Sequence, residues 1–267
     1  MEGARGSVTD SVDWQIRVPV VGTPISVISP EQLLQLLEAR PGDRATVVAF
    51  CNVHSVMTAR KNQEVARALN EANVAAPDGM PVVWGLKAAG FPDQQRVAGP
   101  TFTESALRRG IKVGWKHYFY GSTPETLARL VDNVERLAPG IQIAGTFSPP
   151  FRPPTDEDIQ SAAEQILGSG ADLVWVGLGM PKQELWMARV RDHLPGVGLL
   201  GVGAAFDFLA GTLVRAPMWM QRTGLEWLHR FGQHPGRLWR RYLINNPTYL
   251  WLLGRQLLRA RLGRGQT

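Results

Sequence analysis

The chain has little cysteine and no long apolar run, and each absence excludes a class of protein. A single cysteine, Cys51, among 267 residues excludes an internal disulfide and is typical of a reducing compartment. The longest uncharged apolar stretch, 197–206, is far shorter than the roughly 20 residues of a transmembrane helix. The first residues have no hydrophobic signal region. We therefore expect a cytoplasmic protein without a transmembrane helix.

The last fifth of the chain lacks lysine and has almost no acid. Residues 215–267 contain ten arginines and one acid, Glu226, which gives this end a net charge of +9. The residues before it hold 19 basic and 22 acidic side chains, so the overall charge of +6 comes from the C-terminal end. Four tryptophans lie among these arginines. This pattern favours an anionic membrane surface or single-stranded nucleic acid, or tryptophans that simply pack on the core.

Apolar runs alternate with helical patterns over most of the chain. A hairpin is predicted over 14–28, with its turn at Gly22-Thr23-Pro24, and a helix over about 54–72. Ser29, Thr101, Thr123 and Thr155 have the sequence of helix N-caps. The predicted strands cover 45–50, 74–76, 116–120, 141–146, 173–177 and 197–202. Strands that alternate with helices predict an α/β fold with a Rossmann-like, doubly wound, mostly parallel sheet.

No strand is predicted after Gly211. The remaining residues have a helical pattern that is interrupted near 232–236 and at Asn245-Asn246-Pro247. We therefore divide the chain into an α/β domain, 1–211, and a basic helical appendage, 212–267.

Asp78 lies in Ala-Pro-Asp-Gly-Met-Pro, directly after the predicted strand 74–76. The flanking prolines and glycine predict a constrained loop, and open α/β sheets bind ligands at the carboxyl ends of their strands. A turn-forming Asp-Gly without chemistry explains the same residues. Arg96 follows eighteen residues later, before a predicted helix start, where an arginine can neutralise a phosphate. Its alternative is a solvated surface side chain.

The segment 175–184, Trp-Val-Gly-Leu-Gly-Met-Pro-Lys-Gln-Glu, predicts a strand, a loop and a helix. Gly177 and Gly179 allow close approach of a ligand to the backbone. Pro181 as the first helical residue leaves the helix N-terminus open to an anion, and Lys182 and Gln183 add donors. The glycine spacing matches neither the dinucleotide fingerprint nor the P-loop. A generic strand-to-helix turn is the alternative.

Two further loops, at 120–123 and 201–211, have the same design. Asp207 is an isolated acid in an apolar stretch, so it either caps a backbone turn or accepts hydrogen bonds from a base or ribose. The acids of 156–158 resemble a metal–diphosphate motif but suit the first turn of a helix better. The histidines have no ligand spacing with one another or with Cys51. We expect no metal site.

Taken in order along the chain, these motifs resemble one family. The residues that carry the resemblance are Asn52, 77–81, 96–99, 119–121, 177–184 and 203–211, with 215–217 and 226–227 continuing it. Over roughly 15–250 the chain resembles the WecG/TagA/CpsF glycosyltransferases. This resemblance implies transfer of a hexose or N-acetylhexosamine-type sugar from a UDP-sugar to a polyprenyl-diphosphate-linked saccharide. It further implies inversion at the anomeric carbon, no metal or other cofactor, and peripheral attachment to the inner face of the cell membrane in exopolysaccharide or related cell-surface polysaccharide synthesis.

The resemblance also implies roles for individual residues. Asp78 is the expected general base, and Arg96 and Gln183 are the other expected catalytic residues. The residues expected to bind substrate or nucleotide are Asn52, Gly121, Ser122, Gly177, Gly179, Pro181, Lys182, Gly203, Phe206 and Asp207. The arginines expected to meet the membrane or the acceptor diphosphate are Arg215, Arg222, Arg230, Arg237, Arg240 and Arg241.

Two points remain beside this interpretation. The family often has a threonine two residues before Asn52, where this chain has Phe50, and we assign Phe50 no role. The alternative function is a nucleotide- or RNA-binding protein without catalysis, which would bind RNA in a salt-sensitive way. That alternative leaves the pairing of Asp78 with Arg96 unexplained, so we expect no nucleic-acid partner. Exposed tryptophans and the resemblance both favour self-association into a homo-oligomer.

Overall fold

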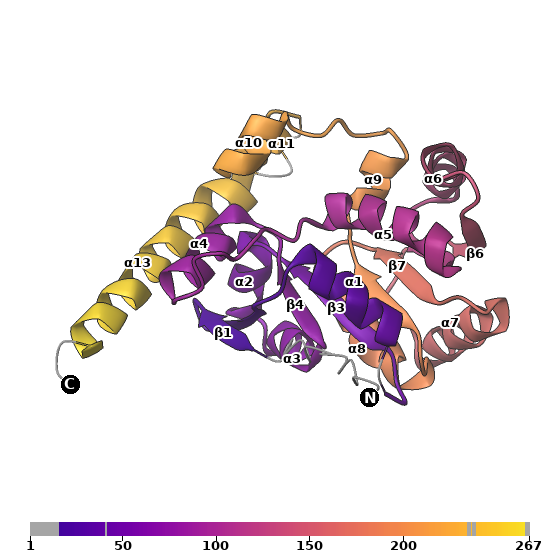
Figure 1. The fold of residues 1–267 in the computed structure, drawn as a ribbon, viewed down its shortest axis with the longest axis horizontal. Coiled ribbons are helices and arrows are strands. Elements are labelled where there is room, and N and C mark those ends of the chain that lie inside the picture. Colours follow the sequence, from indigo (N-terminus) through magenta and orange to yellow (C-terminus); the bar gives the residue numbers. More distant parts are fainter. Residues whose placement is uncertain (1–15, 41, 234–235, 237–238, 265–267) are drawn as a thin grey trace, which may run out of the picture.

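Six parallel strands form the central sheet of the computed structural model, which describes residues 16–40, 42–233, 236 and 239–264 (Figure 1). The strand order is β4-β3-β8-β7-β5-β6, and each neighbouring pair is parallel. The strands are β3 (Thr46–Cys51), β4 (Val74–Pro77), β5 (Lys116–Gly121), β6 (Gln142–Phe147), β7 (Leu173–Gly177) and β8 (Gly198–Gly201). The predicted Rossmann-like parallel sheet is confirmed.

Helices cover both faces of this sheet because successive strand residues point to opposite sides. Val47, Ala49 and Cys51 of β3 join one apolar cluster, and Val48 and Phe50 join the other. The first cluster includes α2 (Val53–Ala59), α3 (Gln63–Glu71), α7 (Asp156–Ser169) and α8 (Lys182–Val190). The second includes α1 (Pro30–Ala39), α5 (Gly99–Val113), α6 (Pro124–Leu137) and α9 (Ala205–Leu209). The sheet is therefore doubly wound, as predicted.

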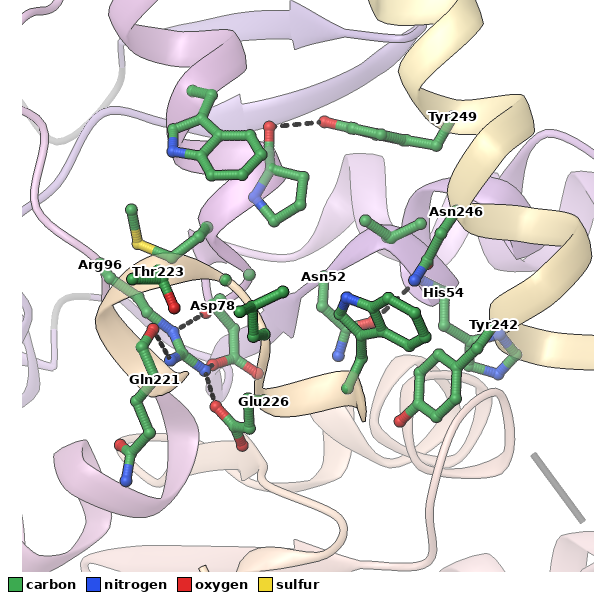
Figure 2. Close-up of a pocket in the computed structure, with 18 of the residues that line it drawn as sticks. Asn52, His54, Asp78, Arg96, Gln221, Thr223, Glu226, Tyr242, Asn246 and Tyr249 are labelled. Carbon is green, nitrogen blue, oxygen red and sulfur yellow. Dashed lines mark hydrogen bonds and ion pairs between the residues drawn. The ribbon is translucent and has the colours of Figure 1, made fainter. Parts of the chain in front are cut away.

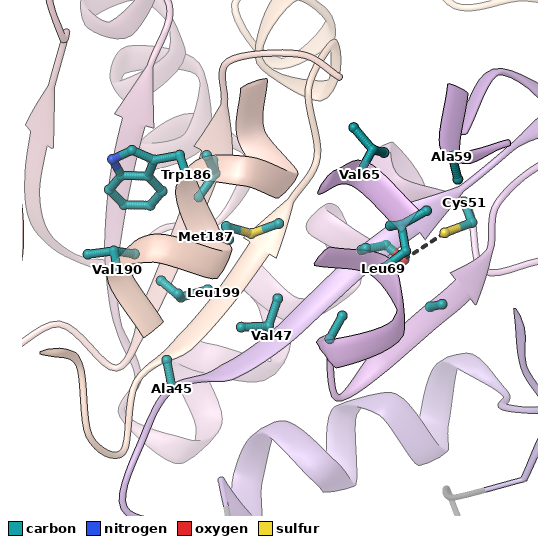
Figure 3. Close-up of a cluster of buried hydrophobic side chains, with 14 of the residues drawn as sticks. Ala45, Val47, Cys51, Ala59, Val65, Leu69, Trp186, Met187, Val190 and Leu199 are labelled. Carbon is teal, nitrogen blue, oxygen red and sulfur yellow. Dashed lines mark hydrogen bonds between the residues drawn. The ribbon is translucent and has the colours of Figure 1, made fainter. Parts of the chain in front are cut away.

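Figure 3 shows part of the first cluster, where α8 and α3 pack on the sheet side by side. Trp186 and Met187 of α8 meet Leu199 of β8, while Leu69 of α3 lies beside Cys51. All five of these side chains are almost fully buried. This packing fixes the strand ends from which the loops of the candidate site emerge.

A short antiparallel hairpin precedes the sheet, with strands β1 (Arg17–Val20) and β2 (Thr23–Ser26). The hairpin was predicted, but its turn lies at Val21 and Gly22, which both have positive φ, so Thr23 already belongs to β2. Arg17 donates to the carbonyl oxygens of Leu69 (3.3 Å) and Asn70 (2.9 Å). Its charge thereby stabilises the C-terminal end of α3.

Two predictions of helix boundaries were wrong. The single helix predicted over 54–72 is two helices, α2 and α3, because the Asn62 side chain accepts from the backbone N–H groups of Glu64 and Val65 and starts a new helix. The capping box predicted at Thr101 is not formed. Helix α5 begins at Gly99, with Pro100 in its first turn, where the missing N–H needs no partner.

The described residues after 217 are mainly helical, as predicted. They form α10 (Met218–Thr223), α11 (Glu226–Gln233), a π-helical turn η2 (Arg240–Ile244) and α13 (Asn245–Arg264). In Figure 1 the segment after α9 crosses the top of the molecule to α10, and α13 continues past α4 (Met80–Ala88). Tyr249 and Leu253 of α13 are buried in the first apolar cluster, and the Tyr249 hydroxyl donates to the Pro81 carbonyl (3.0 Å). The domain boundary at 211/212 stays a prediction.

We predict opposite effects of alanine at two helical glycines. A Cβ on Gly110 of α5 would overlap Nε2 of His117, a fully buried side chain whose Nδ1 accepts from Trp175 Nε1 (3.1 Å). Gly110→Ala should therefore lower the free energy of unfolding by about 1–3 kcal/mol. Gly168→Ala in α7, where a Cβ would meet nothing within 4 Å, should raise it by about 0.5–1 kcal/mol.

Urea denaturation followed by circular dichroism measures both variants. Equal effects at the two sites would show that space beside His117 does not control the stability of α5.

Candidate active site

Asp78 and Asn52 lie side by side at the carboxyl ends of β4 and β3. Cys51 and Pro77 are register partners in these parallel strands, so the next residue of each strand enters the same space. The Asp78 N–H donates to the Cys51 carbonyl (2.9 Å), which continues the strand pairing by one residue. A Cβ on Gly79 would lie 3.2 Å from the Asn52 Cβ, so the chain after Asp78 needs a small residue here. The predicted position of Asp78, directly after a strand at the carboxyl edge of the sheet, is confirmed.

Asn52 is the N-cap of α2. Its Oδ1 accepts from the N–H groups of His54 (2.9 Å) and Ser55 (3.4 Å), and Ser55 Oγ accepts from the Asn52 N–H (3.2 Å). This capping box holds the Asn52 side chain at the wall of the cavity beside Asp78. Its expected contact with substrate stays a prediction.

One arginine holds two carboxylates at this position. Arg96 Nη2 donates to Asp78 Oδ1 (3.3 Å) and to Glu226 Oε2 (2.8 Å). Asp78 comes from the end of β4, Arg96 from the loop before α5, and Glu226 from the start of α11. All three side chains are between 17 and 19 % exposed, so water screens their charges only in part. Figure 2 shows the three side chains converging at the base of the cavity.

Arg96 also ties the loops together through the backbone. Its Nε donates to the Asp78 carbonyl oxygen, and its Nη1 donates to the Gln221 carbonyl oxygen of α10 (3.3 Å). The guanidinium thus joins the end of β4 to α10 and α11. Sequence reasoning predicted a phosphate as its counter-ion, whereas the structure places two carboxylates there.

Burial is the largest influence on the charge state of Asp78 and raises the pKa of its carboxyl. The charge of Arg96 opposes this shift, and the like charge of Glu226 adds to it. For Arg96, burial disfavours the charged form, but the two carboxylates outweigh burial and raise its pKa. Asp78 is consequently a stronger base than a solvated aspartate, held beside a permanent cation.

A cavity of about 340 Å³ opens above Asp78. Elements on both sides of residue 211 line it, since Trp84 comes from α4 whereas Trp227, Tyr242 and Tyr249 come from the C-terminal helices. Aromatic walls with a few convergent polar groups are typical of small-molecule sites. The remaining lining residues are Asn52, Val53, His54, Gly79, Met80, Pro81, Arg96, Gln221, Thr223, Gly224, Leu225, Glu226, Arg230, Asn246 and Leu250.

The predicted glycine loops lie at the carboxyl ends of β5, β7 and β8, along the same edge of the sheet. A Cβ on Gly121, which has a φ of 121°, would lie 2.7 Å from the Gly177 carbonyl carbon, and a Cβ on Gly177 would overlap the Phe206 ring. Phe206 is fully buried and supports Gly177 from the core. Ser122 has a positive φ of 62°, a conformation that a non-glycine residue rarely adopts outside functional loops and turns.

Gln183 fixes the loop between β7 and α8 to the end of β8. Its Oε1 accepts from the Gly179 N–H (3.1 Å), and its Nε2 donates to the Gly201 carbonyl (2.7 Å) and to Glu184 Oε1 (2.9 Å). Gly203 passes so close that a Cβ there would lie 3.2 Å from Gln183 Oε1. Gln183 is therefore buried in this loop and does not line the cavity above Asp78.

The predicted site residues thus form two groups. Asn52, Asp78 and Arg96 meet at the cavity, while Gln183 and the glycine loops lie two to four strands from β4, on the order of 10–20 Å. Pro181 is the N-cap of α8 rather than its first helical residue, and the exposed Lys182 ammonium lies 4.3 Å from the centre of the Phe151 ring. Asp207 is half-buried in α9, where its carbonyl oxygen accepts from the Thr212 N–H (2.9 Å).

The predicted membrane arginines have several different environments. Arg215 donates to Thr101 Oγ1 (2.8 Å) and pairs with Glu104 (3.5 Å), so it attaches the C-terminal helices to α5. Arg230 lines the cavity, and Arg222 is exposed. Arg240 and Arg241 belong to η2, but their side chains are outside the described part of the structure. Arg237 lies outside the described residues.

The acids of 156–158 have the structural role that their position in a first turn predicted. Asp158 completes the capping box of Thr155 and pairs with Arg152 (2.9 Å), and Asp156 pairs with Arg189 (2.8 Å). Over the described residues, no group of three or more histidine, cysteine or acidic side chains is arranged to hold a metal ion. Metal-independent chemistry stays a prediction.

Sequence reasoning assigned no role to Glu226 or to Glu184. Glu226 had a signal, because it is the one acid among ten arginines in the C-terminal segment. Glu184 follows Gln183 in the 175–184 motif and is only 3 % exposed. Both carboxylates act on predicted site residues, Glu226 on Arg96 and Glu184 on Gln183.

Comparison with known proteins identifies the family to which this chain is similar. The family described as "Glycosyl transferase WecG/TagA/CpsF family" matches residues 18–263. A protein of Bacillus spizizenii named N-acetylglucosaminyldiphosphoundecaprenol N-acetyl-beta-D-mannosaminyltransferase is 32% identical over 208 residues, which are 78% of each chain. The range matched by the family, 18–263, includes Asp78, Arg96 and Gln183.

We predict that Glu184 makes stability fall as pH rises. Its Oε1 accepts from Gln183, its Oε2 has no hydrogen-bond partner among the described residues, and burial raises its pKa to about 7. A carboxyl group whose pKa is raised on folding adds stability at pH values below its pKa in the unfolded chain. This contribution is lost as pH rises through about 7. Glu184→Gln should remove about 3 kcal/mol of this pH dependence between pH 5 and 8.

Chemical denaturation at several pH values measures the effect. Glu164→Gln, which removes the same charge from the exposed face of α7, is the matched control and should retain the wild-type slope. A Glu184→Gln protein with that same slope would contradict the prediction.

Proposed function

Because the chain belongs to the WecG/TagA/CpsF family of glycosyltransferases, we propose that it moves a hexose or N-acetylhexosamine-type sugar from a UDP-sugar to a polyprenyl-diphosphate-linked saccharide. The name of the Bacillus spizizenii relative describes such a transfer, of N-acetylmannosamine to a lipid-diphosphate N-acetylglucosamine. The observation that carries the proposal is Asp78, a carboxylate of raised basicity in a cavity with aromatic walls. Such walls suit the apolar faces of a sugar ring.

In the proposed reaction Asp78 removes the proton from the attacking hydroxyl of the acceptor. The freed oxygen forms a bond to the anomeric carbon of the donor, and the bond from that carbon to the diphosphate oxygen breaks. The electron pair leaves with UDP, and attack opposite the leaving group inverts the anomeric centre. One positioned base is sufficient for this single displacement. Asp78 is the cavity's carboxylate that follows a sheet strand directly, on a loop fixed by Cys51 and Arg96.

The leaving diphosphate needs positive groups in this metal-independent proposal. Lys182 is exposed at the start of α8, beside the backbone of the Gly179 loop. Arg230 and Arg96 lie on the cavity side. A nucleotide sugar is an extended ligand, so the glycine loops would hold its nucleotide while its sugar reaches Asp78. This division fits the two groups of site residues along the strand ends.

The proposed acceptor is attached to a lipid, and the C-terminal helices suit a membrane surface. No helix of the described residues is both long and apolar enough to cross a bilayer. Trp251 and Leu258 of α13 are 58 and 61 % exposed, although Tyr249 and Leu253 of the same helix are buried. Arg255 lies over Trp251, with its guanidinium carbon 4.6 Å from the ring centre. Apolar side chains flanked by arginines favour peripheral binding to anionic lipids at the cytoplasmic face.

We predict that Asp78→Asn abolishes transfer but not donor binding. The amide cannot accept the proton, so turnover should fall by about 10²–10⁴-fold, while the Kd for UDP changes little. Release of UDP with a short-chain lipid-diphosphate sugar acceptor measures turnover, and calorimetry measures binding. Asp93→Asn, a change of the exposed aspartate between β4 and α5, should retain activity. Near-normal turnover of Asp78→Asn would overturn the base assignment.

We predict that the exposed face of α13 is required for membrane binding. Trp251→Ser combined with Leu258→Ser should release the protein from vesicles with anionic lipid, because the exposed apolar contacts are lost. Ile111→Ser combined with Val113→Ser removes similarly exposed apolar side chains from α5 and should leave binding unchanged. Vesicle co-sedimentation measures both. Equal binding of the two double variants would exclude this face of α13 as the membrane contact.

A further inference from the structure

Glu226 is the closer of the two carboxylates that share Arg96. The distance from Arg96 Nη2 is 2.8 Å to Glu226 Oε2 and 3.3 Å to Asp78 Oδ1. The same guanidinium donates to the Gln221 carbonyl through Nη1 and to the Asp78 carbonyl through Nε. Two contacts from α10 and α11 therefore decide how the guanidinium faces Asp78 (Figure 2).

We propose that Glu226 is a positioning residue for the transfer reaction, which acts through Arg96 to keep Asp78 aligned and basic. This inference rests on the proposed function of Asp78 as the general base. It assigns to the C-terminal segment a defined chemical contribution, which is separate from any contact with the membrane.

The geometry explains how a carboxylate outside the strand ends can act on the base. An arginine facing a single aspartate forms two parallel hydrogen bonds and engages both carboxylate oxygens. Here Glu226 and Gln221 hold the guanidinium so that Arg96 reaches the Asp78 side chain through Oδ1. Asp78 Oδ2 is then the oxygen that takes the proton from the acceptor.

The charges around Asp78 support the same role for Glu226. Arg96 and Arg230 favour its ionised form, Glu226 disfavours it, and the buried Cys51 lies beneath it on β3. The other titratable groups at the cavity are His54 from α2, Tyr242 from η2 and Tyr249 from α13. Without Glu226, Asp78 would face two arginines with no compensating acid from α11. Its carboxylate would be more stable and therefore a weaker base.

The pH dependence of kcat in the full chain tests this role. The rate of the wild-type enzyme should rise with pH as Asp78 loses its proton. In Glu226→Gln this rise should move to lower pH, because a like charge has been removed, and the plateau should fall on the order of 10- to 100-fold as Arg96 turns toward Asp78. Glu226→Asp keeps the charge and should restore much of the plateau and the position of the rise.

Glu104→Gln is the matched control. Glu104 forms an ion pair of the opposite arrangement, in which a carboxylate of α5 pairs with Arg215 of the C-terminal segment at 3.5 Å. It does not line the cavity. Its loss should weaken attachment of the segment without moving the pH of half-maximal rate.

A Glu226→Gln enzyme whose rate falls while the rise stays at the wild-type pH would overturn the inference, because Glu226 would then only attach α11. If Glu226→Gln fails to fold, Glu226→Asp decides the matter through the same profile, because a Glu226→Asp enzyme that loses the plateau or moves the rise although it keeps the charge would overturn the inference. Transfer by Asp78→Asn would instead overturn the proposed base itself. Loss of transfer in Asp78→Asn with an unmoved profile in Glu226→Gln removes only this inference.

Discussion

The ion pair of Arg96 with Asp78 and Glu226 connects the sheet to the C-terminal helices. Each of its members comes from a different part of the chain, and each is only 17–19 % exposed. Removing Arg96 would leave two partly buried carboxylates without their shared counter-charge, which destabilises strongly. The position of α11 and the chemistry of Asp78 are therefore coupled. The cavity lies between the ends of β3 and β4 and the C-terminal helices, which this contact attaches to the sheet together with Arg215 and Tyr249.

The parallel sheet places the remaining groups on one edge. Every strand of the order β4-β3-β8-β7-β5-β6 points the same way, so all the loops at the carboxyl ends meet one ligand surface. The contact of Gly121 with Gly177, supported by Phe206, keeps that surface free of side chains at β5 and β7. Glu184 is a buried acid behind this surface and orients Gln183. Burial of this acid lowers stability when the carboxyl group is ionised, while its hydrogen bond to Gln183 holds the loop in place.

Local sequence patterns predicted the helices and strands, whereas the side-chain partners at the candidate site depend on tertiary contacts. Strand periodicity and the prolines around Asp78 were sufficient to locate it, because the end of a parallel strand is a local feature. Asn62 divided a predicted helix through a cap that periodicity alone does not show. The partner of Arg96 was missed because Glu226 is 130 residues away in sequence. Only the folded chain brings them together, although a lone acid among ten arginines already marked that position.

The last helix shows why composition alone left three interpretations of the basic end. Tyr249 and Leu253 are buried, so part of its apolar content belongs to the core. Trp251 and Leu258 lie on the exposed side and contribute nothing to that core, and Arg255 stacks on one of them. A helix that served only as packing would present polar side chains to solvent. The exposed apolar side, together with the cavity that α13 helps to line, supports the proposal that this helix holds the cavity against a membrane surface.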